Sequence, residues 1–282
     1  MSMYIIEPHI HMYSRTTDDY QAMYRSGIRV VVEPSFWLGC DRRYAGSFYD
    51  YFRLILEFET IRAKRFGIDH YCCISLNPKE TENRALVDEV LSGIGEYLDH
   101  PRCIGIGEIG LNNITENEIY AFRRQLLFAE ERKMPVIVHL PHFNKVKGAQ
   151  IIVAIVKAEG VNQRRIEIDH NTEETMAIVR GTGCFTGLTV YPYSKLDPQR
   201  VSNIIKEFGA ERILINGSAD WGVSDPLSLP RTIGFLRNDG HREETLKDLF
   251  HDNAYTFYSQ SPRWDPEYHI EPVPVSCYQR QP

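Results

Sequence analysis

The sequence predicts an α/β protein built as a (β/α)8 TIM barrel, in which eight parallel strands are surrounded by helices. Short runs of apolar and β-branched residues recur along the chain, and an amphipathic stretch generally follows each of them. Strands that alternate with helices are typical of parallel sheets. Eight such units in about 240 residues match a closed barrel with its ring of helices.

The individual elements follow from these patterns. The apolar runs predict strands at residues 4–10, 29–35, 70–76, 103–109, 135–140, 165–170, 184–190 and 213–218. The amphipathic stretches predict helices at 17–26, 46–66, 84–98, 116–133, 146–159, 173–181, 198–208, 227–238 and 243–257. Asp197 and Pro198 are typical of a helix start, and Gly209 is typical of a helix end. Thr17 or Asp18 is expected to cap the first helix.

The residues after the first expected strand argue against the main competing fold, a doubly wound open sheet. That fold usually carries a glycine-rich, phosphate-binding turn at this position. The chain instead has Pro8, His9, Ile10 and His11. The barrel is therefore the favoured architecture.

The chain divides into a single barrel domain, residues 1–258, and a proline-rich C-terminal tail, residues 259–282. No internal linker interrupts the barrel pattern, whereas five prolines fall within the last part of the chain: Pro262, Pro266, Pro272, Pro274 and Pro282. We expect the tail to extend over the barrel or to be partly disordered, as chain ends often are. A contact in a homodimer is the alternative role.

Composition indicates an ordinary globular protein that acts on a small molecule. Hydrophobic residues make up 43% of the chain and charged residues 25%, which is enough for a sizeable core. The net charge of −6, without a block of Lys or Arg, makes a nucleic-acid partner less expected. No CxxC pair is present to support a thiolate zinc site. Neither a signal peptide nor a long apolar run is visible, so we expect a cytoplasmic protein that does not cross a membrane.

The first expected strand ends in a pair of histidines, His9 and His11. Alternate residues of a strand point to the same side, so the two imidazoles are expected to aim at one spot. By itself, an HxH pair is as typical of two structural histidines, in the core or facing solvent, as it is of a metal site. Its meaning depends on what the other strands supply.

Four further strands end in residues of the kind that bind metals. Glu108 lies in a glycine-flanked apolar run, where a buried carboxylate needs a cation or another partner. His139 and His170 end the fifth and sixth strands, and Asp220 lies at or just beyond the eighth. Each residue alone could be a structural one. Barrel enzymes, however, keep their active sites at the carboxyl ends of the strands. Four imidazoles and two carboxylates there predict a site for Zn²⁺, Mn²⁺ or Fe²⁺ rather than Ca²⁺.

At these positions the sequence resembles the TatD-like branch of the amidohydrolase superfamily. That branch has an HxH pair on strand one, a glutamate in a GEIGL-type segment, histidines ending strands five and six, and an aspartate at strand eight. All six positions match within residues 4–258, and the segment LFHDNA at 249–254 is similar to the closing helix of that family.

The resemblance implies a site for two divalent metal ions, with Zn²⁺ or Mn²⁺ expected first and Fe²⁺ or Mg²⁺ as alternatives. His9, His11 and Asp220 would hold one ion, and His139 and His170 would hold the other. Glu108 would bridge the two ions. Paired ions about 3.5–4 Å apart activate a bridging water. Asp220 and Glu108 are then the catalytic carboxylates, with Asp220 taking the proton of that water.

Two acidic residues flank the expected ligands. Glu7 and Asp169 are expected either to orient the imidazoles through hydrogen bonds or to point into the barrel wall.

The chain also departs from the TatD-like pattern. After the fifth strand, TatD-like nucleases tend to have an arginine suited to phosphate, whereas this chain has Leu140, Pro141 and His142. His142 is therefore an expected substrate contact, or alternatively a surface histidine. Aromatic residues in the loops of the same face predict a pocket for a ring-containing or partly apolar molecule. Those named as substrate contacts are Tyr191, Trp221 and Trp37.

Three functions are compatible with these residues. The favoured one is a metal-dependent hydrolase that cleaves an ester, amide, lactone or phosphoester bond in a small metabolite. Segments around His170 and Asp220 are also similar to TatD-related proteins of Ebo-type biosynthetic gene clusters, which points to the same class. The second is a TatD-type metal-dependent deoxyribonuclease acting as a 3′-exonuclease. The third is a barrel that binds metal and ligand without catalysis.

Overall fold

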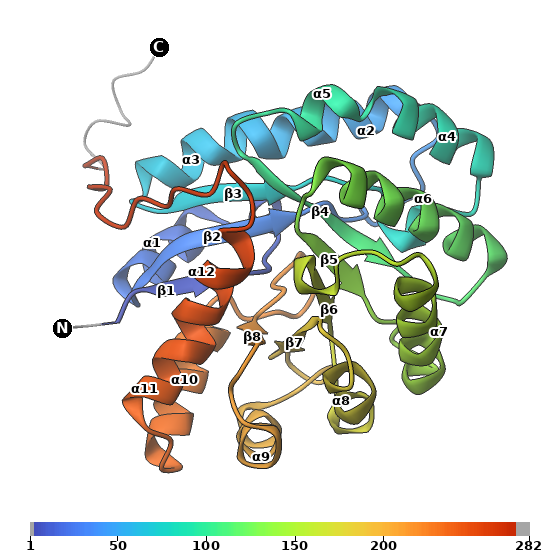
Figure 1. Cartoon of the computed structure of the whole chain (residues 1–282). Helices are drawn as coiled ribbons and strands as arrows, with labels where there is room; N and C mark the ends of the chain where they lie inside the picture. The colour runs from blue at the N-terminus through green and yellow to red at the C-terminus, as the bar shows by residue number, and fades with distance from the viewer. Residues whose placement is uncertain (1–2, 275–282) are drawn as a thin grey trace.

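Eight parallel strands form the centre of the computed structural model, which describes residues 3–274 (Figure 1). They are hydrogen-bonded in sequence order, each to the next. All eight expected strands are present, most of them one to three residues shorter than expected. They are β1 (Ile5–Glu7), β2 (Ile28–Pro34), β3 (Asp69–Cys73), β4 (Cys103–Gly110), β5 (Val136–His139), β6 (Ile166–Asp169), β7 (Phe185–Thr189) and β8 (Ile213–Asn216).

The barrel closes between β8 and β1 through residues that lie beyond the ends of both strands. The backbone N–H of Ser218 donates to the carbonyl of His9 at 2.8 Å. The N–H of His11 donates to the carbonyl of Ala219 at 2.9 Å. These bonds hold the segment after β1 against the segment after β8, and the predicted barrel fold is confirmed.

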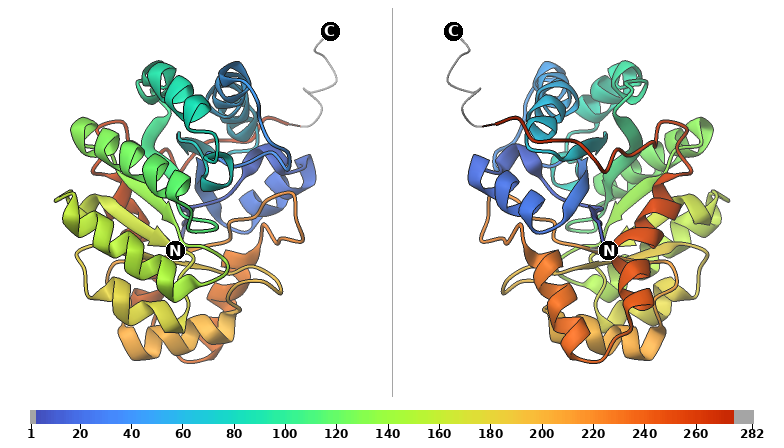
Figure 2. Two further views of the ribbon diagram at one scale, coloured as in Figure 1. Left: turned by 90° about the vertical axis from the view of Figure 1, so that its right-hand side faces the viewer. Right: turned by 90° about the vertical axis from the view of Figure 1, so that its left-hand side faces the viewer.

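Helices form a ring around the strands (Figure 2). They are α1 (Thr17–Arg25), α2 (Ala45–Arg53), α3 (Thr60–Arg65), α4 (Arg84–Gly93), α5 (Gly95–Leu98), α6 (Glu116–Arg132), α7 (Lys145–Ala158), α8 (Glu173–Arg180), α9 (Pro198–Phe208), α10 (Ser228–Asn238), α11 (Glu243–Lys247) and α12 (Asn253–Tyr258). The π-helical segments η2 (Leu54–Glu59) and η5 (Asp248–Asp252) make α2–α3 and α11–α12 continuous, as the long expected helices require.

Local capping explains where two of these helices begin. Asp197 accepts a hydrogen bond from the backbone N–H of Arg200, so α9 starts as expected. The cap expected for α1 was wrong by one residue. Thr16 accepts from the N–H of Asp19, and the Asp19 side chain accepts from the N–H of Thr16. This reciprocal pair satisfies two backbone donors, which a cap at Thr17 would not do.

The C-terminal part of the chain covers the amino ends of the strands. Phe257, Tyr258 and Trp264 pack with inward-facing residues such as Ile104 and Leu214 in one buried cluster. The segment after α12 then continues toward α3, in red in Figure 1, where the N–H of Val273 donates to the carbonyl of Arg65. Because this end is covered, the open mouth of the barrel is at the carboxyl ends. The last part of the expected tail, 275–282, lies outside the described residues.

Four of the described cysteines lie inside the fold. Cys72, Cys73, Cys103 and Cys184 are buried, where a free cysteine acts as a small apolar side chain, and Cys40 is exposed. Among residues 3–274, no helix is both long and apolar enough to cross a membrane.

Candidate metal centre

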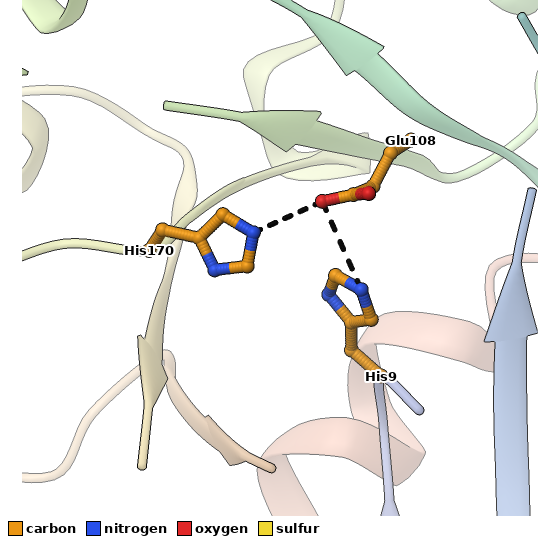
Figure 3. A group of neighbouring side chains, drawn as sticks. All are labelled: His9, Glu108 and His170. Carbon is orange, nitrogen blue, oxygen red and sulfur yellow. Dashed lines mark hydrogen bonds and ion pairs between the residues drawn. The ribbon is translucent and has the colours of Figure 1, made fainter. Parts of the chain in front are cut away.

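A buried carboxylate lies at the centre of the barrel mouth, surrounded by imidazoles. The Oε1 atom of Glu108, on β4, is 2.8 Å from His139 Nδ1 and 3.0 Å from His170 Nε2. The same oxygen is 3.8 Å from His9 Nε2. Figure 3 shows the side chains of His170 and His9 both pointing toward Glu108, His170 from the left and His9 from below. Two strands, β4 and β5, and the segments that follow β1 and β6 therefore deliver their polar side chains to one point.

His9 and His11 meet although they do not lie on a strand. β1 ends at Glu7, so the alternation expected for a strand does not by itself explain their direction. The segment stays extended because the N–H of Ile10 bonds to the carbonyl of Val32 and that of His11 to Ala219. The two Nε2 atoms face each other at 3.3 Å.

Asp220 lies in the loop after β8 and lines the same cavity as Glu108, His139 and His170. The volume of this cavity is about 390 Å³. The Oδ1 atom of Asp220 accepts hydrogen bonds from the Tyr191 hydroxyl at 2.8 Å and from the N–H of Gly222 at 2.7 Å. Asp220 thus lines the same cavity as the buried cluster and is held by donors from its own loop and from the loop after β7.

Hydrogen bonds set the orientation of two imidazoles. Asp169 Oδ2 is 2.6 Å from His9 Nδ1, and Thr189 Oγ1 is 2.6 Å from His170 Nδ1. In both rings the Nδ1 atom is engaged, which leaves Nε2 directed at the cavity. Glu7 does not do the same, because it accepts hydrogen bonds from the backbone N–H groups of His9 and Gly217. Of the two alternatives expected for these acidic residues, Asp169 has the orienting role and Glu7 does not.

The protonation states suit metal binding. Burial lowers the pKa of His170 to about 3 and holds the pKa of His11 well below its usual range. Both rings are therefore neutral at physiological pH, the form that binds a cation. Burial opposes ionisation of Glu108, but the adjacent His139 and His9 hold the pKa of its carboxyl well below the ordinary value. Glu108 is therefore a carboxylate.

Three of the six expected ligands lie close enough together to share one ion. The ligand atoms of His9, Glu108 and His170 lie within 4.8 Å of one another. His11 is fully buried, and its Nδ1 atom has no hydrogen-bond partner among the described residues. Imidazole nitrogens that converge on each other and on one carboxylate, in a buried place, match the ligands that Zn²⁺, Mn²⁺ and Fe²⁺ prefer.

The expected substrate contacts fall into two groups. His142 and Tyr191 line the cavity. Trp37 and Trp221 do not line it, and pack instead against each other and against Phe36, with ring centres 5.5–6.4 Å apart. Phe36 lines the cavity and stacks on His11 at 4.0 Å. The two tryptophans therefore support the wall of the cavity from behind.

Three polar residues of the cavity were missed in the sequence. Asn77 donates to Glu108 Oε2 at 3.0 Å, and Lys79 lies beside it in the turn η3 (Pro78–Glu80). The Lys195 ammonium is 3.2 Å from His170 Nδ1 and 3.3 Å from Ser218 Oγ. These residues follow β3 and β7, so the rule that favours strand ends points to their loops but does not give the direction of their side chains.

Comparison with known proteins agrees with this geometry. Residues 7–220 match the family described as TatD related DNase. An uncharacterized metal-dependent hydrolase of Methanocaldococcus jannaschii is 28% identical over 259 residues, which cover 90% of this chain and 99% of the relative. An aryldialkylphosphatase of Saccharolobus solfataricus is 27% identical over 172 residues, which cover 52% and 54% of the two chains. The crystal structure of a TatD-like protein from Archaeoglobus fulgidus superposes with a TM-score of 0.75 at 25% identity, covering 90% of this chain and 99% of the other.

Proposed function

The chain belongs to the TatD related DNase family of metal-dependent hydrolases, and from this premise we propose that it cleaves an ester, amide, lactone or phosphoester bond in a small metabolite with a metal-activated water. One observation carries the proposal. Glu108 Oε1 has imidazole nitrogens of His139 and His170 within 3.0 Å, at the bottom of a cavity that Asp220 also lines.

The residues that would hold the metal follow from this arrangement and from the family. We assign His9, His11 and Asp220 to one ion, His139 and His170 to a second, and Glu108 to both. Zn²⁺ or Mn²⁺ fits the donors best, with Fe²⁺ or Mg²⁺ as alternatives. When bound, such ions lower the pKa of a water and polarise the bond to be cleaved.

The side chains of the cavity supply the proton transfer. Asp220 is the group proposed to take a proton from the attacking water and to return it to the leaving group. Tyr191 and the N–H of Gly222 both bond to its Oδ1 atom, which holds the carboxylate in one orientation. Asn77 does the same for Glu108 through Oε2, so that Oε1 stays directed at the imidazoles.

The shape and lining of the cavity support a small substrate. Its volume of about 390 Å³ is within the range of small-molecule sites. Phe36 and Tyr191 offer aromatic surface, and no arginine is among the described residues that line it. A metabolite of the kind made by Ebo-type gene clusters belongs to this class. The aryldialkylphosphatase relative supports the inclusion of phosphoesters among the bonds.

A second function is supported by the family itself, whose description is that of a DNase. The same metal centre could hydrolyse the terminal phosphodiester of a DNA strand. The substrate, rather than the chemistry at the metal, separates the two proposals.

One experiment tests both functions. The protein is purified without chelators, its metal content is measured, and it is assayed on ester, amide, lactone and phosphoester panels and for 3′-exonuclease activity with Mg²⁺ or Mn²⁺. We expect turnover of a small substrate that is lost on metal removal and in Asp220→Asn and Glu108→Ala, but kept in the exposed control Glu207→Gln. DNA digestion that disappears in Glu108→Ala would favour the nuclease. Full activity after metal removal would overturn both.

A further inference from the structure

Two lysines face the cavity from opposite sides of the barrel. Lys79 follows β3 and Lys195 follows β7, and both line the cavity together with Glu108 and Asp220. In a barrel whose eight strands run in sequence order, β3 and β7 lie diametrically across the mouth. Their ammonium groups therefore approach the same space from two directions.

These lysines differ from most of the other charged residues in their contacts. Within the described part of the chain, neither ammonium lies within 4.0 Å of a carboxylate. Lys79 Nζ instead lies 4.2 Å from the centre of the Trp37 ring, and Lys195 Nζ bonds to Ser218 Oγ and approaches His170 Nδ1. Lysines on the outer surface, such as Lys206 and Lys247, have an acidic partner at 2.6 Å.

The surroundings of the two lysines disfavour their positive charges. Burial lowers the pKa of Lys79, because removal from water disfavours the charged form, although the carboxylates of Glu108 and Asp220 act in the opposite direction. Lys79 and Lys195 are two like charges lining one cavity, so they also repel each other. An anion placed between them would offset both effects.

Metal binding would free Lys195 for such an anion. If His170 binds a cation through Nε2, its Nδ1 atom keeps a proton, which it donates to Thr189 Oγ1. Nδ1 then cannot accept from Lys195, and Ser218 Oγ is the one remaining side-chain partner that the described residues supply to the ammonium. The other Lys195 hydrogens are then available to a ligand.

We propose that Lys79 and Lys195, the lysine pair, hold an oxyanion group of the substrate, a carboxylate or a phosphate, and so select an anionic small molecule. This inference rests on the proposed hydrolase function and names its substrate class. The lysine pair supplies from other loops the positive charge that the absent family arginine would have given. A lysine ammonium is a point charge that suits either oxyanion.

Anion binding to the protein as purified tests the proposal without need of turnover. Calorimetry measures the affinity for two probes, inorganic phosphate and malonate, in the wild type and in Lys79→Met, Lys195→Met, Lys195→Arg and Lys157→Met. Lys157 is an exposed lysine of α7 and serves as the matched control. Loss of one charged hydrogen bond is expected to weaken binding on the order of tenfold in each Met variant of the lysine pair. Lys195→Arg and Lys157→Met should stay close to the wild type.

The probes separate the two sources of the oxyanion. Weakening for phosphate alone assigns a phosphorylated substrate, and weakening for malonate alone assigns a carboxylated one. Affinities for both probes that stay within twofold of the wild type in Lys79→Met and Lys195→Met, at equal metal content, would overturn the proposal. Because two variants are used, misfolding of one leaves the other as a test. Lysine-dependent binding without any hydrolysis would reject only the proposed function.

Discussion

The hydroxyl of Tyr191 donates a hydrogen bond to Asp220 Oδ1 at 2.8 Å, across the loops that follow β7 and β8. The N–H of Gly222 reaches the same oxygen. Both of these donors act on one side of the carboxylate, so its other oxygen is the one left to face the cavity. Tyr191 lines the cavity and stays a predicted substrate contact, while its hydroxyl holds the proposed proton acceptor.

Tyr191→Phe is therefore expected to lower kcat by roughly tenfold, because one charge-assisted hydrogen bond to Asp220 is lost. The metal content should stay unchanged, since the imidazoles and Glu108 are untouched. Steady-state kinetics and metal analysis check both statements. Tyr193→Phe is the matched control, because Tyr193 is 98% exposed. A Tyr191→Phe variant with unchanged kcat would show that the hydroxyl does not position Asp220.

Asp169→Asn is expected to weaken metal binding by about 10–100-fold, the usual effect of losing a carboxylate that orients a ligating histidine. Asp169 Oδ2 bonds to His9 Nδ1 at 2.6 Å, and an amide cannot supply the same charge. Competition with a chromophoric chelator measures the affinity. Glu7→Gln is the control, since Glu7 is equally buried and contacts only backbone N–H groups. Equal affinities in both variants would contradict the role of Asp169.

The barrel, and the meeting of the histidines at one of its ends, could be predicted from the sequence for one physical reason. Strand pairing determines where each strand ends, and parallel strands bring their carboxyl ends to the same mouth. His139 and His170, at or next to such ends, needed no further information. His9 and His11 lie past the end of β1, and their direction depends on backbone hydrogen bonds to Val32 and Ala219 that no local pattern reveals.

The cavity residues that were missed follow strand ends at some distance. Lys195 lies six residues beyond β7, and its direction depends on the fold of the loop before α9. Trp37 and Trp221 stay predicted substrate contacts, and the packing of their rings on Phe36 was not expected from the sequence. Side-chain packing between loops joins residues far apart in the chain, so spacing along the sequence carries little information about it.

Gly187→Ala is expected to destabilise the fold by about 1–3 kcal/mol, the usual cost of adding a methyl group to a tightly packed interior. A Cβ atom at this position on β7 would overlap Asp169 Oδ1 and lie 2.7 Å from Glu167 Oε1. Asp169 would have to move, so metal affinity should fall as well. Thermal unfolding and chelator competition measure the two effects. Gly234→Ala, in the open on α10, should be neutral or stabilising by up to about 1 kcal/mol. Equal behaviour of the two variants would refute the close contact.

A second buried pair, Glu33 and His70, lies away from the cavity between β2 and β3. Both side chains are fully buried, and Glu33 Oε2 is 2.8 Å from His70 Nε2. Burial raises the pKa of Glu33 to about 8 and lowers that of His70 to about 4. Near neutral pH, Glu33 is therefore protonated and donates to Nε2, while it also accepts from the N–H of Tyr13.

This pair makes the stability of the fold depend on pH in a defined direction. Folded Glu33 keeps its proton up to about pH 8, whereas in the unfolded chain the carboxyl loses it near its ordinary pKa of 4.5. The contribution of Glu33 to the free energy of unfolding is thus complete below pH 4.5, declines as the pH rises from there, and is lost once the pH passes about 8. Between pH 6.5 and 8.5 the free energy of unfolding should fall by about 2 kcal/mol from Glu33, whereas loss of the proton of His70 in the unfolded chain raises it by only about 0.4 kcal/mol. Urea unfolding at several pH values, compared with Glu33→Gln, checks the slope, because the amide can make both hydrogen bonds without titrating. Parallel curves for the two proteins would mean that Glu33 is already ionised in the folded state.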